Sequence, residues 1–207
     1  YNISPETLVE EKHPSATIDK ILNKELTFEM YKDYAVCANG AMFRKDIRGF
    51  MPKLMEKMYA ERKIYKKKML QAKQEYEKNP TKQLEKDIAK YNNFQMARKI
   101  ALNSCYGAIG NQYFRFFKLA NAEAITLSGQ TSIRWIENKI NKFLNKLLET
   151  DNKDYVIASD TDSIYLHMDP LVKKIFKERE ESDQSVLRFL TKVCDVEFEK
   201  YIQNSYE

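Results

Sequence analysis

Two aspartates, Asp160 and Asp162, stand one residue apart inside the apolar stretch "YVIASDTDSIYLHM" at positions 155–168. Ionised carboxylates are costly to bury unless they are paired, hydrogen-bonded or bound to a metal. Carboxylate oxygens suit hard divalent cations such as Mg²⁺. Two such ions, about 3.5–4 Å apart, can activate an attacking hydroxyl and stabilise a leaving phosphate. The pair is therefore a candidate half-site for magnesium.

A bare Asp-x-Asp pattern has other interpretations. It is also typical of an Asx-type turn, in which the carboxylates accept hydrogen bonds from nearby backbone N–H groups. An EF-hand loop is excluded, because no glycine and no glutamate stand at the required later positions. A glycosyltransferase-type Asp-x-Asp, which holds a nucleotide diphosphate through a metal ion, remains an alternative at this point.

A second group of candidate residues lies in "ARKIALNSCYGAIGN", residues 97–111. Lys99, Asn103 and Tyr106 are spaced four and three apart, so they share one face of a helix. Asparagine and glycine lower the stability of an otherwise good helix, so their presence calls for a reason. Gly107 would let another backbone come close, and Tyr106 offers a flat ring to a base.

Arg62 and Lys66 are also four apart, on the helical stretch that comes before. If the two stretches form an antiparallel hairpin, both side chains could converge with Lys99, and such cations suit a triphosphate. The alternative is a solvated basic face, because three further lysines crowd the same stretch: Lys63, Lys67 and Lys68.

Hydrophobic periodicity predicts the elements that carry these groups. Apolar residues recur at helical spacing over about 54–78 and again from 84 toward Gly107, with the polar turn "KNPT" between them. This pattern predicts two long helices in an antiparallel hairpin, the second beginning at Pro80. Asn121 is the predicted cap of a third helix, and a last helix is predicted from about Gln184 to Tyr201.

Alternation predicts strands on either side of the aspartate pair, at 155–158 and 163–168, with residues 159–162 as the turn. Side chains alternate along an extended chain, so Asp160 and Asp162 are expected to point to the same side.

Other short elements are weaker in the sequence. A hairpin is predicted for 34–37 and 41–44 around the Asn-Gly turn at 39–40. Residues 107–119, "GAIGNQYFRFFKL", are expected to form a loop with a short extended piece, and 173–184, "KKIFKEREESDQ", a solvated connection.

Composition sets broad limits. The chain has 207 residues, of which 43% are hydrophobic and only five are glycine, which favours a helix-rich globular protein. Its net charge of +5 weakly favours an anionic partner. The cysteines lack metal-ligand spacing and fit a reducing cytosol: Cys37, Cys105 and Cys194. No apolar run is long enough to span a bilayer, so we expect no membrane partner. The first residue is Tyr1 rather than Met, which indicates a processed product or a piece of a longer protein.

Taken together, these stretches resemble the family B DNA polymerases, most closely their tailed-bacteriophage branch. "ASDTDSIYL" is similar to motif C of that family, usually Tyr-Gly-Asp-Thr-Asp-Ser, and "KIALNSCYG" to motif B, Lys-x-x-x-Asn-Ser-x-Tyr-Gly. "ERKIYKKKM" resembles the part of the first fingers helix that carries an arginine and a lysine, and "YNISPET" the segment just after motif A. The resemblance spans nearly the whole chain.

The resemblance implies an α+β fold in which a helical-hairpin fingers domain is inserted into part of a polymerase palm, made of an antiparallel β-hairpin and helices. Residues 1–51 would be the palm segment after motif A, and 52–107 the fingers. Residues 108–207 would be the part of the palm that carries motif C, without a thumb.

The resemblance also implies roles for individual residues. Asp162 matches the metal-binding catalytic aspartate, and Asp160 its partner beside the metal and the primer end. The implied chemistry is attack of a primer 3′-hydroxyl on the α-phosphate of a dNTP, assisted by two Mg²⁺. The residues that match the nucleotide-binding positions are Arg62, Lys66, Lys99 and Asn103 at the triphosphate, and Tyr106 and Gly107 beside the nascent base pair.

Motif C departs from the family pattern at Ala158 and Ser159, which stand where Tyr and Gly are usual. Serine restricts the backbone more than glycine, so we expect altered contact with the primer and retained metal binding.

The sequence contains no motif A stretch and no thumb motif, which predicts a fragment or split subunit of a polymerase, inactive without the part that carries motif A. Its expected partners are primer–template DNA, dNTP and the remaining polypeptide with motif A, exonuclease and thumb, in the cytoplasm of a host cell if the gene is phage-borne. The alternative is a non-catalytic DNA- or nucleotide-binding module that retains the fold. A glycosyltransferase does not explain the stripe from Lys99 to Gly107.

Overall fold

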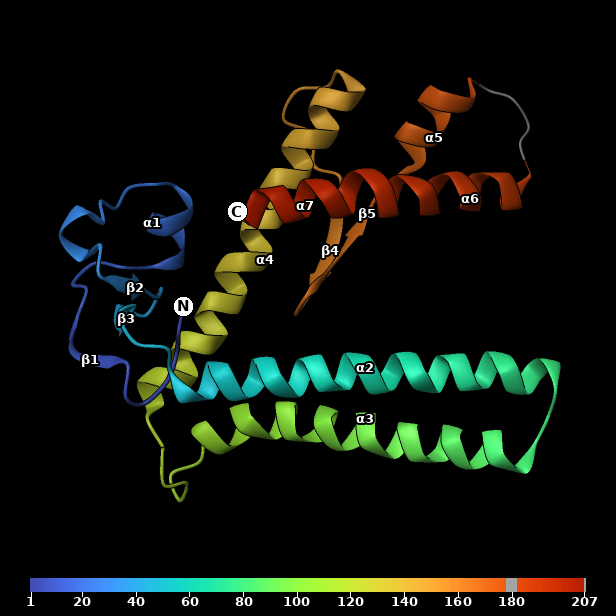
Figure 1. Ribbon diagram of the computed structural model, residues 1–207. Coiled ribbons are helices and arrows are strands. Elements are labelled where there is room, and N and C mark those ends of the chain that lie inside the picture. Colours follow the sequence, from blue (N-terminus) through green and yellow to red (C-terminus); the bar gives the residue numbers. More distant parts are fainter. Residues whose placement is uncertain (178–181, 207) are drawn as a thin grey trace. The chain divides into compact units, whose positions relative to one another are not determined.

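The computed structural model describes residues 1–177 and 182–206. The chain divides into two compact units, Tyr1–Leu127 and Ser128–Glu207. Long helices and two small antiparallel sheets make up the fold, which confirms the predicted α+β class (Figure 1).

The sheet of the first unit has three strands: β1 (Leu8–Lys12), β2 (Tyr34–Val36) and β3 (Ala41–Arg44). β3 lies in the middle and pairs antiparallel with both neighbours. The predicted hairpin is therefore present, and its turn has Gly40 at φ +79°. β1 was not predicted, because its acidic and basic residues show little apolar alternation.

Two short helical elements lie between β1 and β2, namely α1 (Ile18–Leu22) and the 3-10 turn η1 (Glu29–Tyr31). The core beneath the sheet is small. It consists of the buried residues Cys37, Ala41, Phe43 and Ala124.

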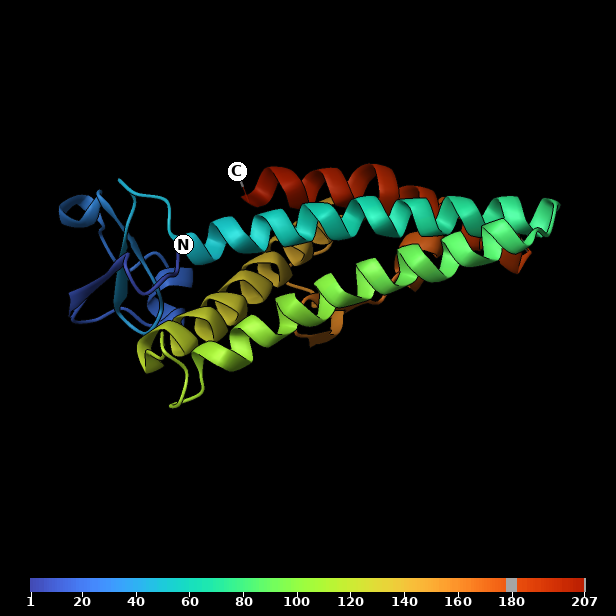
Figure 2. The same cartoon turned by 60° about the horizontal axis from the view of Figure 1, so that its bottom comes forward.

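The predicted helical hairpin is formed by α2 (Phe50–Lys78) and α3 (Lys82–Ile109), which lie side by side and antiparallel (Figures 1 and 2). The predicted start of the second helix at Pro80 is wrong. Thr81 is the N-cap instead, and its hydroxyl accepts a hydrogen bond from the N–H of Leu84 at 3.2 Å. A threonine hydroxyl can satisfy an open N–H group of the first turn, which proline cannot do.

Three cross-contacts define the register of the α2–α3 hairpin. Glu61 binds Arg98 at 2.9 Å, the rings of Tyr65 and Phe94 meet at 5.1 Å between centroids, and Lys68 lies 5.8 Å from the ring of Tyr91. Each step forward along α2 therefore matches one step back along α3.

The first turn of α2 is capped by side chains from far away in the sequence. The N-cap, Gly49, has no side chain with which to cap its own helix. The N–H groups of residues 49–51 each donate to the N-terminal segment: Gly49 to Asn2 Oδ1 at 2.9 Å, Phe50 to Glu6 Oε1 at 2.5 Å, and Met51 to Ser4 Oγ at 3.4 Å. Glu6 also places a negative charge at this helix N-terminus, where the helix dipole favours it.

The segment after α3 differs from the prediction. Residues 111–118 form consecutive turns without the expected extended piece, and α4 (Leu119–Leu148) begins before the predicted cap Asn121. The carbonyl of Lys118 accepts the N–H groups of both Asn121 and Ala122, so the helix starts earlier. The Asn121 side chain is fully buried inside the helix and has no hydrogen-bond partner among the described residues.

The second unit contains the hairpin of β4 (Val156–Asp160) and β5 (Ser163–Leu166), followed by α5 (Asp169–Phe176). The chain ends with α6 (Asp183–Val193), one π-helical turn (Cys194–Phe198) and α7 (Glu199–Tyr206). The core is formed by one stripe of α4 together with the residue before β4 and the last residue of the π-helical turn. Its buried members are Ile136, Ile140 and Leu144 from α4, Tyr155 and Phe198.

Two predictions about this unit need correction. The last helix extends to Tyr206 and contains a π turn, and residues 173–176 of the expected connection belong to α5. α5 is short and its stripe includes the buried Leu171, so tertiary packing supports it. Residues 178–181 of that connection lie outside the described part of the chain.

Within the described part of the chain, no helix combines the length and the apolar character needed to cross a membrane. The cysteines form no disulfide there either.

Candidate functional site

The aspartate pair lies at the tip of the β4–β5 hairpin. Asp160 is the last residue of β4 and pairs with Ser163, so Thr161 and Asp162 form a two-residue loop. Thr161 has φ +51°, and the N–H of Asp162 donates to the carbonyl of Asp160 at 2.6 Å. The predicted turn at 159–162 is thus shorter than expected. Asp160 and Asp162 are not alternate residues of one extended strand, so the argument that placed them on one side does not apply.

The strand before the tip is anchored at its base by Tyr155. This residue was predicted to begin the strand, but it precedes β4 and is almost completely buried. Its N–H donates to Asn141 Oδ1 on α4, and its hydroxyl lies 2.8 Å from Thr150 Oγ1. The hairpin therefore extends from a well-packed base.

Both aspartates at the tip are exposed to solvent. Asp160 Oδ1 accepts a hydrogen bond from Thr161 Oγ1 at 3.0 Å, and neither carboxylate forms an ion pair with a described lysine or arginine. The apolar surroundings do not bury the pair, because Ile157 and Tyr165 are themselves 70% and 58% exposed. The two carboxylates are not buried, so the energetic cost of burying charge does not explain why two aspartates stand here.

The donor set at the tip fits a hard divalent cation in kind, since it consists of carboxylate oxygens open to solvent. The tip supplies two such side chains. Among the described residues, no group of three or more His, Cys, Asp and Glu comes together anywhere. The tip thus offers two carboxylate side chains of the kind that such a cation prefers.

The cations predicted to bind the triphosphate lie on the α2–α3 hairpin. From its register, Lys99 is level with residue 60, about 3 Å along the axis from Arg62 and about 9 Å from Lys66. Arg62 is half-buried, and its Nε is buried without a hydrogen-bond partner among the described residues. Lys66, Lys99 and Asn103 are exposed. The hairpin thus brings Arg62 and Lys99 to one level and places Lys66 further along.

Tyr106 and Gly107 lie in the last turns of α3. Tyr106 is 49% exposed, and its hydroxyl lies 3.0 Å from Thr126 Oγ1, which also bonds the carbonyl of Ala122. Thr126 was not predicted, and no local pattern marks it. A Cβ atom at Gly107 would meet no other atom within 4 Å. No contact within the described chain therefore requires glycine at this position.

The ion pair of Glu61 and Arg98 was also missed. Arg98 lies 4.8 Å from the ring of Tyr65, so one guanidinium contacts both a carboxylate and an aromatic face of α2. In an antiparallel hairpin, positions equally far from the turn face each other, and this rule would have found the pair. The contact fixes the register on which the level of Arg62 and Lys99 depends.

Comparison with known proteins gives the family. Residues 1–205 match the sequence profile of DNA polymerase family B. The chain belongs to this family. The family B chain is 32% identical to the DNA-directed DNA polymerase of Enterobacteria phage T4 over 215 residues, covering 84% of the chain and 24% of that relative. It is 29% identical to the DNA-directed DNA polymerase of Escherichia phage RB69 over 247 residues, covering 99% of the chain and 27% of that relative.

A eukaryotic relative is similar over a shorter part. The DNA polymerase alpha catalytic subunit of Arabidopsis thaliana is 38% identical over 119 residues, which is 58% of this chain and 7% of that protein. The family B chain thus spans about a quarter of the length of the two phage relatives. The predicted family is confirmed, and the roles of individual site residues stay predictions.

Proposed function

We propose that this chain is the fingers and part of the palm of a template-directed DNA polymerase that adds dNTPs to a primer 3′-hydroxyl. Membership of family B and the name DNA-directed DNA polymerase of both phage relatives support the proposal. The structural observation that carries it is the pair of exposed carboxylates at the tip of the β4–β5 hairpin, one at the end of β4 and one in the two-residue loop, in the segment that matches motif C. Solvent access leaves these oxygens available to a metal and a primer end.

In this proposal Asp160 and Asp162 hold Mg²⁺ together with a carboxylate from motif A. The bound ions would supply Lewis-acid activation of the primer 3′-hydroxyl and neutralise charge on the leaving pyrophosphate. The hydrogen bond from Asp162 N to Asp160 O closes the loop and so limits the motion of the backbone that carries the two carboxylates. Ser159, which pairs with Ile164 just before the tip, would lie near the primer end and alter its contact.

The triphosphate would lie along the α2–α3 hairpin. Arg62 is half-buried, and its guanidinium is a planar set of donors that suits phosphate oxygens. Lys99 adds a second cation at the same level, with Lys66 and Asn103 as further donors. Closure of the fingers would place these groups on the triphosphate and exclude water. Tyr106 and Gly107 would face the nascent base pair.

We further propose that the chain needs the rest of a polymerase for catalysis. Groups of a catalytic unit depend on each other, so a site that lacks its motif A carboxylate should lose most of its rate. Primer–template DNA, dNTP and a polypeptide with motif A, exonuclease and thumb are then its partners.

Primer extension tests this function. The 207-residue chain is assayed alone and mixed with a polypeptide that carries motif A, each with Mg²⁺ and dNTPs. We expect primer extension only in the mixture. In the Asp162→Ala variant the extension rate should fall on the order of 10⁴-fold. The melting temperature should not change, because Asp162 is exposed.

Asp151→Ala is the matched control, since Asp151 is another exposed aspartate of the same unit. It should extend primers as the unmodified chain does. Absence of extension in every mixture, with undiminished DNA binding by Asp162→Ala, would contradict the proposal and favour a non-catalytic DNA-binding module.

A further inference from the structure

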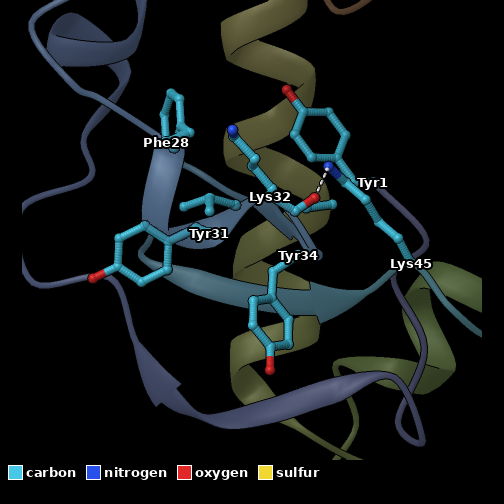
Figure 3. A pocket seen from close by; sticks show the side chains of 8 residues that line it. Tyr1, Phe28, Tyr31, Lys32, Tyr34 and Lys45 are labelled. Carbon is cyan, nitrogen blue, oxygen red and sulfur yellow. Dashed lines mark hydrogen bonds between the residues drawn. The ribbon is translucent and has the colours of Figure 1, made fainter.

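A cavity of about 460 Å³ opens beside β2 in the first unit, lined by none of the residues assigned above. Its walls combine aromatic rings with cations, and in Figure 3 the side chain of Lys32 lies between the rings of Phe28 and Tyr1. The side chains that give the cavity its character are Tyr1, Phe28, Tyr31 and Tyr34 with Lys32 and Lys45.

The aromatic wall is held in place from behind. His13 is 8% exposed, and its ring centroid lies 5.9 Å from that of Phe28 and 4.8 Å from that of Tyr31. The backbone N–H of His13 donates to the carbonyl of Gly40 at 2.8 Å, which ties this support to the β2–β3 turn. His13 thus packs against both rings in the ligand-free chain, and such support before binding lowers the entropy cost of binding.

The cations of the cavity are not neutralised within it. Lys45 Nζ donates one hydrogen bond to the carbonyl of Lys32 at 3.0 Å, drawn as a dashed line in Figure 3, and an ammonium group has three donors. No aspartate or glutamate of the described chain lines this cavity. Lys32 and Lys45 also line an adjoining hollow. Its carboxylates are Glu6, Asp33 and Asp46, and Asp46 is already paired with Arg44 at 2.5 Å.

Flat apolar faces next to ammonium groups are the chemistry that binds single-stranded nucleic acid, where bases stack on rings and lysines meet phosphates. A purely apolar ligand would gain little from two lysines, and a bare phosphate would gain little from four rings. The volume falls in the range of small-molecule sites, which suits one nucleotide and not a duplex.

We propose that this cavity binds one unpaired nucleotide, with its base against Phe28 and Tyr31 and its phosphate at Lys32 and Lys45. Phe28 and Tyr1 are 38% and 51% exposed, so the ring faces can be reached from solvent. The site is separate from the proposed dNTP site, which uses other residues of the chain. Its ligand is either a nucleotide within a single strand or a free mononucleotide, since both offer the same base and phosphate.

Photocrosslinking of the 207-residue chain tests the site directly. The probe is an oligothymidylate with one 5-iododeoxyuridine, whose base crosslinks to aromatic side chains that it contacts, and the adducts are mapped by mass spectrometry. We expect adducts at Phe28, Tyr31 or Tyr34. Competition with unlabelled oligothymidylate but not with dTMP assigns the site to a strand, and competition with both assigns it to the nucleotide unit. Adducts confined to other parts of the chain overturn the proposal.

Variants give a second, quantitative measure by fluorescence anisotropy with labelled oligothymidylate. Phe28→Leu should weaken binding on the order of tenfold, as loss of one stacked base does. Met30→Leu is the local control, because Met30 lies in the same turn, is 89% exposed and does not line the cavity.

A double substitution keeps the proposal testable even if Phe28→Leu fails to fold. Lys32→Gln with Lys45→Gln alters only exposed side chains and should lower the affinity and the salt dependence of binding. Lys12→Gln with Lys24→Gln removes the same charge from exposed positions outside the cavity. Equal loss in the two double variants overturns the proposal. The same photocrosslinking is repeated with Asp162→Ala, which cannot extend primers under the proposed function. Adducts in the cavity of this variant show that binding at this site does not depend on catalysis.

Discussion

The start of α2 and the end of α3 lie at the same end of one helical hairpin but differ in how their polar groups and glycines are used. At the start of α2, the N–H groups are satisfied by residues 2–6, and a Cβ at Gly49 would lie 2.6 Å from the Cβ of Ser4. At the end of α3, Asn103 is exposed and a Cβ at Gly107 would meet nothing within 4 Å.

This difference separates a glycine that the fold needs from one that it does not. Gly49 is enclosed by Ser4, which is itself fully buried, so the close approach requires the absence of a side chain. Gly107 stands inside a helix, where glycine costs up to about 1 kcal/mol relative to alanine, with no contact in return. The proposed function supplies a reason for it, namely the approach of a nascent base pair.

The largest expected effect is at the enclosed site. Gly49→Ala should lower the free energy of unfolding by about 2–3 kcal/mol, because the new methyl group must displace buried Ser4. Urea denaturation followed by circular dichroism measures this loss. A change below about 0.5 kcal/mol would show that the two ends of the hairpin do not differ in packing as described.

At the exposed end of α3, Lys99→Ala should weaken dNTP binding by about 10- to 100-fold, the range for loss of a charge-assisted hydrogen bond. Stability should be unchanged, since Lys99 is exposed. Titration of the assembled polymerase with dNTP measures the affinity. Lys86→Ala, an exposed lysine of the same helix, is the control, and an equal effect there would reduce Lys99 to part of a general basic face.

A matched pair of glycines sharpens the comparison further. Gly107→Ala and Gly129→Ala both replace an exposed glycine inside a helix beside open space, so each should raise the free energy of unfolding by about 0.5–1 kcal/mol. Only Gly107→Ala should slow nucleotide incorporation, which single-turnover kinetics measures. Unchanged kinetics in both variants would remove the functional reason for Gly107.

The smallest effect concerns pH at the start of α2. Burial alone would raise the pKa of Glu6, but hydrogen bonds from Ser4 and from the N–H of Phe50 outweigh it and hold the pKa below its usual value of 4.5. A lowered pKa adds stability above pH 4.5 that is lost as the pH falls through the folded-state pKa. The contribution should be under about 1 kcal/mol, because the carboxylate is exposed.

Denaturation at pH 7 and at pH 3 tests this contribution. Glu6→Gln should be less stable than the unmodified chain at pH 7 and nearly equal to it at pH 3. A constant difference at both values would mean that the charge of Glu6 has no part in capping α2.

Much of the local structure was accessible from the sequence. The two long helices repeat apolar residues over many turns, and Asn-Gly and Asp-x-Asp mark two hairpin turns, so the helices and the hairpins were predicted close to their observed positions. Boundaries failed where a competing contact decided them. Thr81 caps α3, which begins at Lys82 and not at Pro80, and the carbonyl of Lys118 accepts the first N–H groups of α4, so this helix begins before Asn121.

The sequence by itself determined the long helices, the two hairpins and the family, because periodicity, turn residues and motif spacing report interactions between neighbours in the chain. Only the tertiary structure decided that residues 2–6 cap α2 and that the aspartate pair is exposed. It alone also showed that Gly107 faces open space while Gly49 does not. Burial, and hydrogen bonds between residues far apart in the sequence, depend on which segments contact each other in the folded chain. Local sequence patterns do not specify those contacts.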